Sequence, residues 1–343
     1  MSIHTKERLS YIDFLKVIAA FMIVMLHVSA AYVDMSNSFP QNMVYFINDF
    51  TRVALPIFIM VSGALLLRSQ YQFNFKKKFF FILKIYIVWS AFYVLVHQAA
   101  YLVSDNPLLT IPEMIVQWIR GPYHFWYLTM LMGFYILMPL LEKLKDFHSI
   151  SYILGLSFAV IYVYEPIRPF LPDCLNTFIG GAIVLQPATI LFYFLIGAWM
   201  HQLPLEKKLA KLSLCFFICG LGLRIYRFYT VTQFNQIVDN HPLNLYSQLL
   251  MAIGIFYGVR YLFRNVESSQ RLIQLSNCTL YIYVLSAFFI FAFENILKDL
   301  WGKILPIDSI SILIWSIICF ICSYIAAAFI RKINQQRQTH ARH

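Results

Sequence analysis

The sequence predicts an all-α protein, a polytopic membrane helix bundle of about ten transmembrane helices. The first observation is composition: 60% of the 343 residues are hydrophobic and only 13% are charged. Ordinary soluble domains are nearer roughly 45–50% apolar and about 25% charged. So few polar residues cannot shield this much apolar surface from water, so part of the protein surface must contact lipid instead.

The second observation is segment length. About 20 apolar residues are needed for a helix to cross the hydrocarbon core. Ten stretches approach this length, and they lie at roughly 12–32, 52–68, 79–100, 124–141, 150–164, 178–200, 212–230, 244–263, 276–296 and 309–330. No soluble-looking block separates them. We therefore expect residues 1–333 to form a single transmembrane domain, followed by a disordered cytoplasmic tail over 334–343.

The third observation is the placement of Lys and Arg between the spans. If the N-terminus is cytoplasmic, seventeen of these cations fall on the cytoplasmic side and five near the opposite face. Positive charge marks cytoplasmic loops, so we expect both termini in the cytoplasm, with an even number of spans. The basic net charge of +11 is explained by this distribution. No nucleic-acid-binding motif accompanies it, and nucleic acid is not an expected partner.

Cysteine usage gives no sign of a metal site. Cys319 and Cys322 form a C-x-x-C motif, but it lies inside a continuous apolar segment with no second pair to complete a metal site. We expect these thiols to be small buried hydrophobic groups.

The first span carries two ionisable residues, Lys16 and His27. Eleven residues are almost three helical turns, so the two side chains should share one face, about 16 Å apart along the axis. Charged and titratable groups in a span are usually functional. Snorkelling of Lys16 to the headgroups and a purely structural role for His27 are the alternatives. We expect His27 to be the one titratable group deep in a span.

The second span contains Arg52, Pro56, Ser62 and Gly63. Pro56 would free a backbone carbonyl of the helix. Ser62 and Gly63 would let a ligand or another helix approach closely. Both possibilities stay open from spacing alone.

The third and fourth spans begin with polar and aromatic clusters. The basic residues that lead into the third span are Lys76, Lys77, Lys78 and Lys84. The fourth span opens with His124 and Trp126. Aromatic residues at this position are also typical of the membrane interface.

In this order, the motifs resemble the acyltransferase-3 family of bacterial membrane-bound O-acyltransferases, the surface-polysaccharide O-acetyltransferase type. The resemblance covers essentially the whole chain. Its strongest points are Asp13-x-x-Lys16, the R/K-x10-H pattern that ends at His27, Arg52-x-x-x-Pro56 followed by Ser62-Gly63, and His124-x-Trp126. Weaker points are Phe192-Tyr193-Phe194 with Gly197, and Ser276-x-x-Thr279 with Tyr281 and Tyr283.

The sequence departs from the family pattern at three places. Lys16 replaces the commoner arginine, which keeps the charge but loses the planar fork. The arginine pair of the third span is replaced by Phe81 and Lys84, and a frequent histidine of the ninth span is replaced by Ser286. The last change weakens any mechanism that needs a second histidine there.

The resemblance implies transfer of an acyl group, most often acetyl from acetyl-CoA, to a hydroxyl of a cell-envelope glycan or a lipid-linked sugar. It implies a multi-pass protein of the bacterial inner membrane with no permanently bound cofactor. Lys16, Lys76, Lys77, Lys78 and Lys84 would attract the phosphates of the donor. His27, kept neutral by its surroundings, would act as general base or as a transient acyl carrier.

Supporting roles are expected for the other motif residues. Arg52 or Trp126 would stabilise the developing oxyanion, and Asp13, Ser62, Gly63 and His124 would complete the pocket. The competing interpretation is a transporter of a polysaccharide or a lipid-linked glycan. Such a protein should show paired broken helices or acidic coupling residues in its spans. Asp and Glu here lie almost entirely at the ends of the predicted spans, which favours the enzyme.

Overall fold

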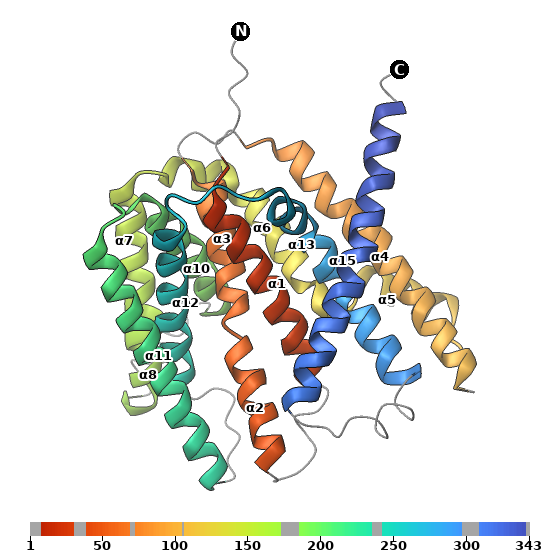
Figure 1. Cartoon of the computed structure of the whole chain (residues 1–343), viewed down its shortest axis with the longest axis horizontal. Helices are drawn as coiled ribbons and strands as arrows, with labels where there is room; N and C mark the ends of the chain where they lie inside the picture. The colour runs from red at the N-terminus through yellow and green to blue at the C-terminus, as the bar shows by residue number, and fades with distance from the viewer. Residues whose placement is uncertain are drawn as a thin grey trace. The chain divides into compact units, whose positions relative to one another are not determined.

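The computed structural model describes residues 8–30, 39–68, 73–104, 106–172, 185–234, 242–296 and 309–340. Every regular element in these ranges is helical (Figure 1), which confirms the predicted all-α fold. The chain forms two compact units. The first contains residues 1–69 and 146–343, and the second contains residues 70–145.

The first unit holds most of the helices. They are α1 (Ser10–Ala30), α2 (Phe39–Thr51), α3 (Ala54–Leu66), α7 (Phe147–Phe158), η3 (Ala159–Tyr164), α8 (Glu165–Ile167), η4 (Arg168–Phe170), α10 (Leu185–Gln202), α11 (Lys207–Phe234), α12 (Pro242–Leu262), α13 (Gln270–Ile296) and α15 (Ser309–His340). The second unit contains α4 (Phe75–Val103), α5 (Ile111–Arg120), η1 (Tyr123–Phe125), α6 (Trp126–Leu141) and η2 (Glu142–Leu144).

The helices agree with a multi-pass membrane protein. Eight segments within the described ranges are long and apolar enough to span a bilayer. The predicted span 244–263 coincides with α12, and the described part of the predicted span 178–200 lies in α10, while residues 178–184 lie outside the described residues. Neither α10 nor α12 is among those eight. The predicted span 52–68 was placed too late in the chain, because the apolar segment covers Met43–Leu66 and is interrupted between α2 and α3.

The C-terminus also differs from the expectation. A tail was predicted after residue 333, but α15 continues to His340. Residues 334–340 contain no Gly or Pro, and their Gln and Arg residues are good helix formers that prolong the preceding helix. The predicted tail residues 341–343 lie outside the described residues.

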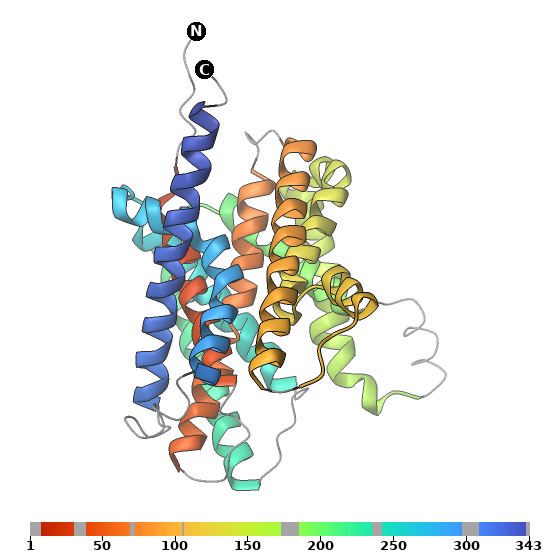
Figure 2. The same cartoon turned by 90° about the vertical axis from the view of Figure 1, so that its right-hand side faces the viewer.

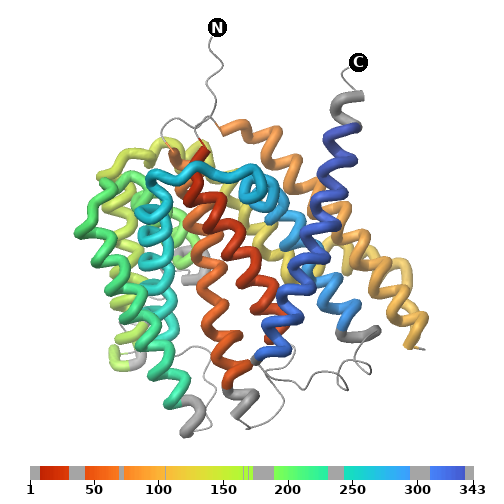
Figure 3. Tube along the Cα trace, in the orientation of Figure 1, coloured from red at the N-terminus to blue at the C-terminus, as the bar shows by residue number. Residues whose placement is uncertain are grey.

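Helix α1 is central in the first unit. It contacts α2, α3, α12, α13 and α15, as the red helix in Figures 1 and 3 illustrates. Its residues Leu15, Ala19 and Val24 are fully buried among these neighbours. Helices α13 and α15 also pack on each other, and Figure 2 shows them side by side. A central helix has little freedom to tilt or rotate, so its polar side chains are held in place.

Helices α3 and α10 approach each other backbone to backbone. A Cβ atom on Gly63 would lie 1.8 Å from the Phe194 carbonyl oxygen, and one on Gly197 would lie 2.1 Å from the Met60 carbonyl oxygen. Glycine at both places permits a close crossing, which is the usual device where helices pack in lipid.

We predict that Gly63→Ala destabilises the protein by about 1–3 kcal/mol, because the added methyl group must push α3 away from α10. Gly222→Ala is the matched control, since no described atom outside its own helix lies within 4 Å of a Cβ there. Thermal unfolding of both variants in detergent, with membrane abundance, would test this. Equal melting temperatures for the two variants would show that the close approach is not needed.

Candidate functional site

Lys16 and His27 lie on one uninterrupted helix, as predicted. Helix α1 runs through Ser10–Ala30, and both side chains are half-buried. The rise of about 1.5 Å per residue therefore applies along the whole interval between them. This confirms the geometry on which the shared face was predicted, while the roles of the two residues stay predictions.

Asp13 fixes the first turn of α1. Its carboxylate accepts two hydrogen bonds from the Arg8 guanidinium, at 2.6 and 2.9 Å. It also accepts from the Ser268 hydroxyl at 2.9 Å and the Ser276 hydroxyl at 2.6 Å. Ser276 belongs to α13, so this buried carboxylate ties α1 to α13 one turn before Lys16. Asp13 is thus an anchor for the helix that carries the predicted site.

The apolar segment Met43–Leu66 breaks at Arg52, between α2 and α3. Pro56 has no backbone N–H, so the Arg52 carbonyl loses its normal partner four residues along the helix. The Gln248 side chain of α12 donates to this carbonyl instead, at 3.1 Å. Arg52 was expected at the beginning of a span, but the structure places it at a break inside one.

A buried charged cluster lies at this break. The Asp49 carboxylate pairs with Arg227 at 3.0 Å and with Arg224 at 3.6 Å. Arg224 also donates to the Asp49 backbone carbonyl, and to the Ser247 hydroxyl at 3.1 Å. The exposed fractions are 6% for Asp49, 1% for Arg224 and 3% for Arg227. Asp49, Arg224, Arg227 and Ser247 form what we call the arginine cluster.

The arginine cluster corrects one expectation from the sequence. His27 was expected to be the one titratable group deep in a span, but Arg224 and Arg227 lie in the apolar segment Lys207–Thr230. Their spacing of three residues puts both on one face of α11. Charged residues inside an apolar segment are the signal that could have revealed them. With Asp49 they place two buried positive charges against one negative charge.

Asn48, the residue before Asp49, connects α2 and Arg52 to α1. Its side-chain nitrogen donates to the Leu26 carbonyl and to the Ser29 hydroxyl, both at 3.1 Å. Its side-chain oxygen accepts from the Arg52 guanidinium at 3.4 Å. The polar network therefore reaches the turn of α1 that carries His27. The predicted residues His27 and Arg52 are brought to one region of the first unit by a residue that sequence reasoning missed.

Ser62 and Gly63 have local structural explanations. The Ser62 hydroxyl donates to the Phe58 carbonyl of its own helix at 3.0 Å. Gly63 faces the backbone of α10, as described above. The packing alternative therefore accounts for the glycine without a ligand.

The remaining predicted residues belong to the second unit. Lys76, Lys77, Lys78 and Lys84 are exposed on α4. The Asn74 side chain caps this helix by accepting from the Lys77 backbone N–H at 3.0 Å. The three successive lysines occupy the first turn, where they surround one end of the helix with positive charge.

His124 and Trp126 occupy different environments. The His124 side chain is 2% exposed and lies edge-on to Tyr93 and Phe125, with ring centroids 5.2 and 4.8 Å away. Trp126 begins α6 and is 45% exposed. His124 is thus a buried member of an aromatic cluster, whereas Trp126 is accessible to a ligand.

No group of three or more His, Cys, Asp or Glu side chains in the described ranges is arranged to hold a metal ion. The polar groups of the site are instead hydrogen-bond donors, acceptors and fixed charges.

The fold and this network define a multi-pass membrane protein with a buried polar site at a helix break. Residues 9–337 match the family model described as an acyltransferase domain, of the acyltransferase-3 type. The chain therefore belongs to this acyltransferase family, as the motifs suggested, and it is an acyltransferase. Searches among curated proteins and among solved structures found no significant match. The family match includes both compact units.

We predict that Asp49→Asn destabilises the protein by roughly 3–5 kcal/mol, because it leaves two buried guanidiniums without a counter-charge. Glu142→Gln, which breaks the partly exposed pair with Lys145 at 3.2 Å, should cost less than about 1 kcal/mol. Chemical unfolding in detergent would compare the two variants. If Asp49→Asn were no worse than the control, Asp49 would not be what balances the buried arginines.

Proposed function

We propose that the protein is an O-acyltransferase that moves an acyl group, most simply acetyl from acetyl-CoA, to a hydroxyl of a cell-envelope glycan or lipid-linked sugar. It would act in the inner membrane of a bacterium, with both termini in the cytoplasm. Family membership supports the acyl transfer. The observation that carries the proposal further is the position of His27, on a buried central helix beside a polar network.

The donor would bind at the cytoplasmic end of α1. Coenzyme A carries phosphates, which ammonium groups attract. Lys16 supplies one such group on α1. The exposed lysines of α4 form a separate basic group within the second unit. With Lys16 holding the phosphates, the extended pantetheine arm would direct the thioester toward His27, about 16 Å further along the helix.

His27 can serve the reaction in two ways. As general base, it takes the proton of the acceptor hydroxyl while the oxygen attacks the thioester carbonyl, and the C–S bond then breaks to release the thiol. As carrier, its ring nitrogen attacks the thioester carbonyl, and the C–S bond breaks to release the thiol. The acceptor oxygen then attacks the acyl-imidazole, the C–N bond breaks, and the freed imidazole takes the proton of the hydroxyl. Arg52 donates to the Asn48 side chain, which itself donates to the Leu26 carbonyl in the turn of α1 that carries His27. Arg52 is the proposed hydrogen-bond donor to the oxyanion in both routes.

One observation favours a second candidate function, export of a glycan or of a lipid-linked intermediate. Helix α2 and helix α3 form a broken span, and the acidic residue Asp49 lies beside the break. Broken helices with charged groups are typical of transporters. Among the described helices, however, Asp49 is already paired with Arg224 and Arg227, which favours a structural role for this carboxylate.

We predict that Lys16→Ala raises the KM for the acyl donor by roughly tenfold, the usual effect of losing a charge-assisted hydrogen bond. The value of kcat should change less, because the phosphates lie far from the reacting atoms. Lys16→Arg is the matched control and should be tolerated, since the charge is kept. Steady-state kinetics with acetyl-CoA would test both variants. Unchanged donor dependence in Lys16→Ala would favour snorkelling instead.

We predict that His27→Ala and His27→Gln lower the acylation rate by a factor on the order of 10²–10⁴ if the residue is a general base. If it carries the acyl group, the loss should be nearly complete, and hydroxylamine should release label from trapped wild-type enzyme. Mass spectrometry of the glycan, with membrane abundance as the control, is the measurement. Wild-type acylation by an abundant His27→Ala protein would refute the catalytic assignment and favour the transporter.

A further inference from the structure

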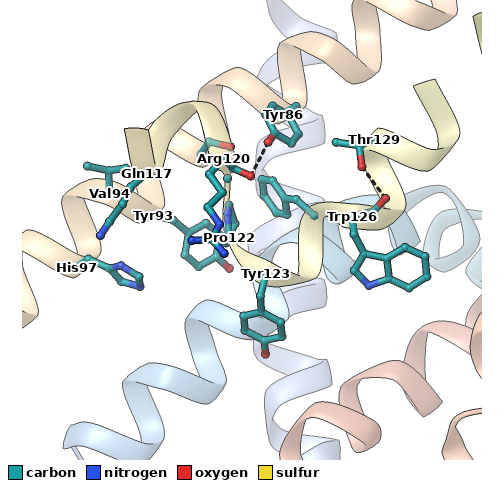
Figure 4. Close-up of a pocket in the computed structure, with 13 residues that line it drawn as sticks. Tyr86, Tyr93, Val94, His97, Gln117, Arg120, Pro122, Tyr123, Trp126 and Thr129 are labelled. Carbon is teal, nitrogen blue, oxygen red and sulfur yellow. Dashed lines mark hydrogen bonds between the residues drawn. The ribbon is translucent and has the colours of Figure 1, made fainter. Parts of the chain in front are cut away.

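The second unit contains a cavity that no step above uses. Its volume is about 570 Å³, and it is lined by α4, the end of α5, η1 and the start of α6. Figure 4 shows the side chains that surround it. This volume lies within the range of about 300–1,000 Å³ that is usual for small-molecule sites.

The cavity is held open by contacts between α4 and α5. The Tyr86 hydroxyl shares its one proton between the carbonyls of Ile119 and Arg120, at 2.9 and 2.8 Å. The Trp118 indole N–H donates to the Ile87 carbonyl of α4 at 2.9 Å. These bonds fix the end of α5 on α4 without any ligand, so the cavity is preformed.

A tight turn completes this wall. Gly121 has φ +67°, a conformation that disfavours other residues. A Cβ there would lie 2.6 Å from the Tyr86 hydroxyl oxygen and 3.1 Å from the Ser90 hydroxyl oxygen. The glycine thus allows the turn to close tightly over α4 and to direct the chain from α5 toward η1.

The lining combines aromatic rings with polar side chains. Tyr93 and Trp126 offer ring surfaces, and Gln117 and Arg120 offer planar polar groups on successive turns of α5 (Figure 4). The Ser90 side chain is 1% exposed, and its hydroxyl has no hydrogen-bond partner among the described residues. At this exposure the hydroxyl belongs to the wall of the cavity beneath Gly121 and offers no surface to a ligand. This lining suits a ligand with many hydroxyl groups and some apolar C–H surface.

The charge of the lining is positive. Arg120 contributes a permanent cation, and the residues that line the cavity include no Asp or Glu. The guanidinium fork matches a carboxylate or phosphate with two parallel hydrogen bonds. An anionic ligand is therefore favoured over a neutral one.

We propose that this cavity binds one anionic sugar residue of the acceptor glycan. Arg120 would hold its acidic group, Gln117 its hydroxyls, and Trp126 the apolar face of its ring. The inference rests on the proposed function for the identity of the ligand as an acceptor. The cavity itself stands on the contacts of the second unit.

The position along α4 agrees with this role. Ser90 and His97 lie 15 and 22 residues after the first residue of α4, or about 22 and 33 Å along the axis. On the proposed orientation, the lysine-rich first turn of α4 is cytoplasmic. The cavity then lies toward the opposite face, where envelope glycans are found.

Direct binding tests the proposal without any acyl transfer. The full-length protein in lipid nanodiscs would be titrated with methyl glucuronide, which is anionic, and with methyl glucoside, which is neutral. Saturation-transfer NMR would follow both sugars. We expect the glucuronide to bind about tenfold more tightly, and Arg120→Gln to abolish that preference. Arg168→Gln, which removes an exposed positive charge of the first unit, should leave it intact.

Two further outcomes would overturn the proposal. If the protein binds the two sugars equally, or binds neither, the proposal for the cavity is wrong. If the wild-type protein still acylates its native glycan in that case, the proposed function is unaffected. Arg120-dependent binding of phosphatidylglycerol in place of the glucuronide would assign the cavity to a lipid headgroup. Conversely, a His27→Gln variant that binds the glucuronide normally would support the cavity whether or not His27 proves catalytic.

Discussion

The structure depends on satisfying polar groups that lie inside apolar helices. Pro56 interrupts the span formed by α2 and α3, and the interruption leaves backbone carbonyls that lipid cannot hydrogen-bond. The Gln248 side chain donates a hydrogen bond to the Arg52 carbonyl, and the Arg224 guanidinium donates one to the Asp49 carbonyl. The helix break, the arginine cluster and the contacts of α11 and α12 with α2 and α3 are therefore parts of one arrangement.

This arrangement fixes the helix that carries the proposed site. At one end of α1, the Asp13 carboxylate ties the helix to α13. Near the other end, Asn48 bonds the Leu26 carbonyl and the Ser29 hydroxyl. With both ends held, Lys16 and His27 keep a constant separation and orientation. Such preorganisation is what acyl transfer requires, because the donor, the base and the hydroxyl must meet in a narrow range of geometries.

The sequence predicted the fold class and the helices well, but only part of the site. Long apolar runs indicate membrane spans directly, and the family motifs singled out Asp13, Lys16 and His27. The second span was predicted to begin at residue 52, whereas the apolar segment begins at Met43 and is interrupted between α2 and α3. Arg224 and Arg227 were overlooked, since their partner Asp49 lies 175 residues or more away in the chain. Only the fold brings such distant charges together, and only the fold forms the cavity between α4 and α5.

The central claim is that the acyl donor enters at the cytoplasmic end of α1 and that the acyl group leaves toward the opposite face. Sealed membrane vesicles from cells that produce the protein, prepared in both orientations, test this most directly. Radiolabelled acetyl-CoA would be added outside each preparation, and label in the glycan fraction would be measured. The account predicts incorporation by inside-out vesicles, where the cytoplasmic face is accessible, and almost none by sealed right-side-out vesicles. Equal incorporation by right-side-out vesicles would contradict it.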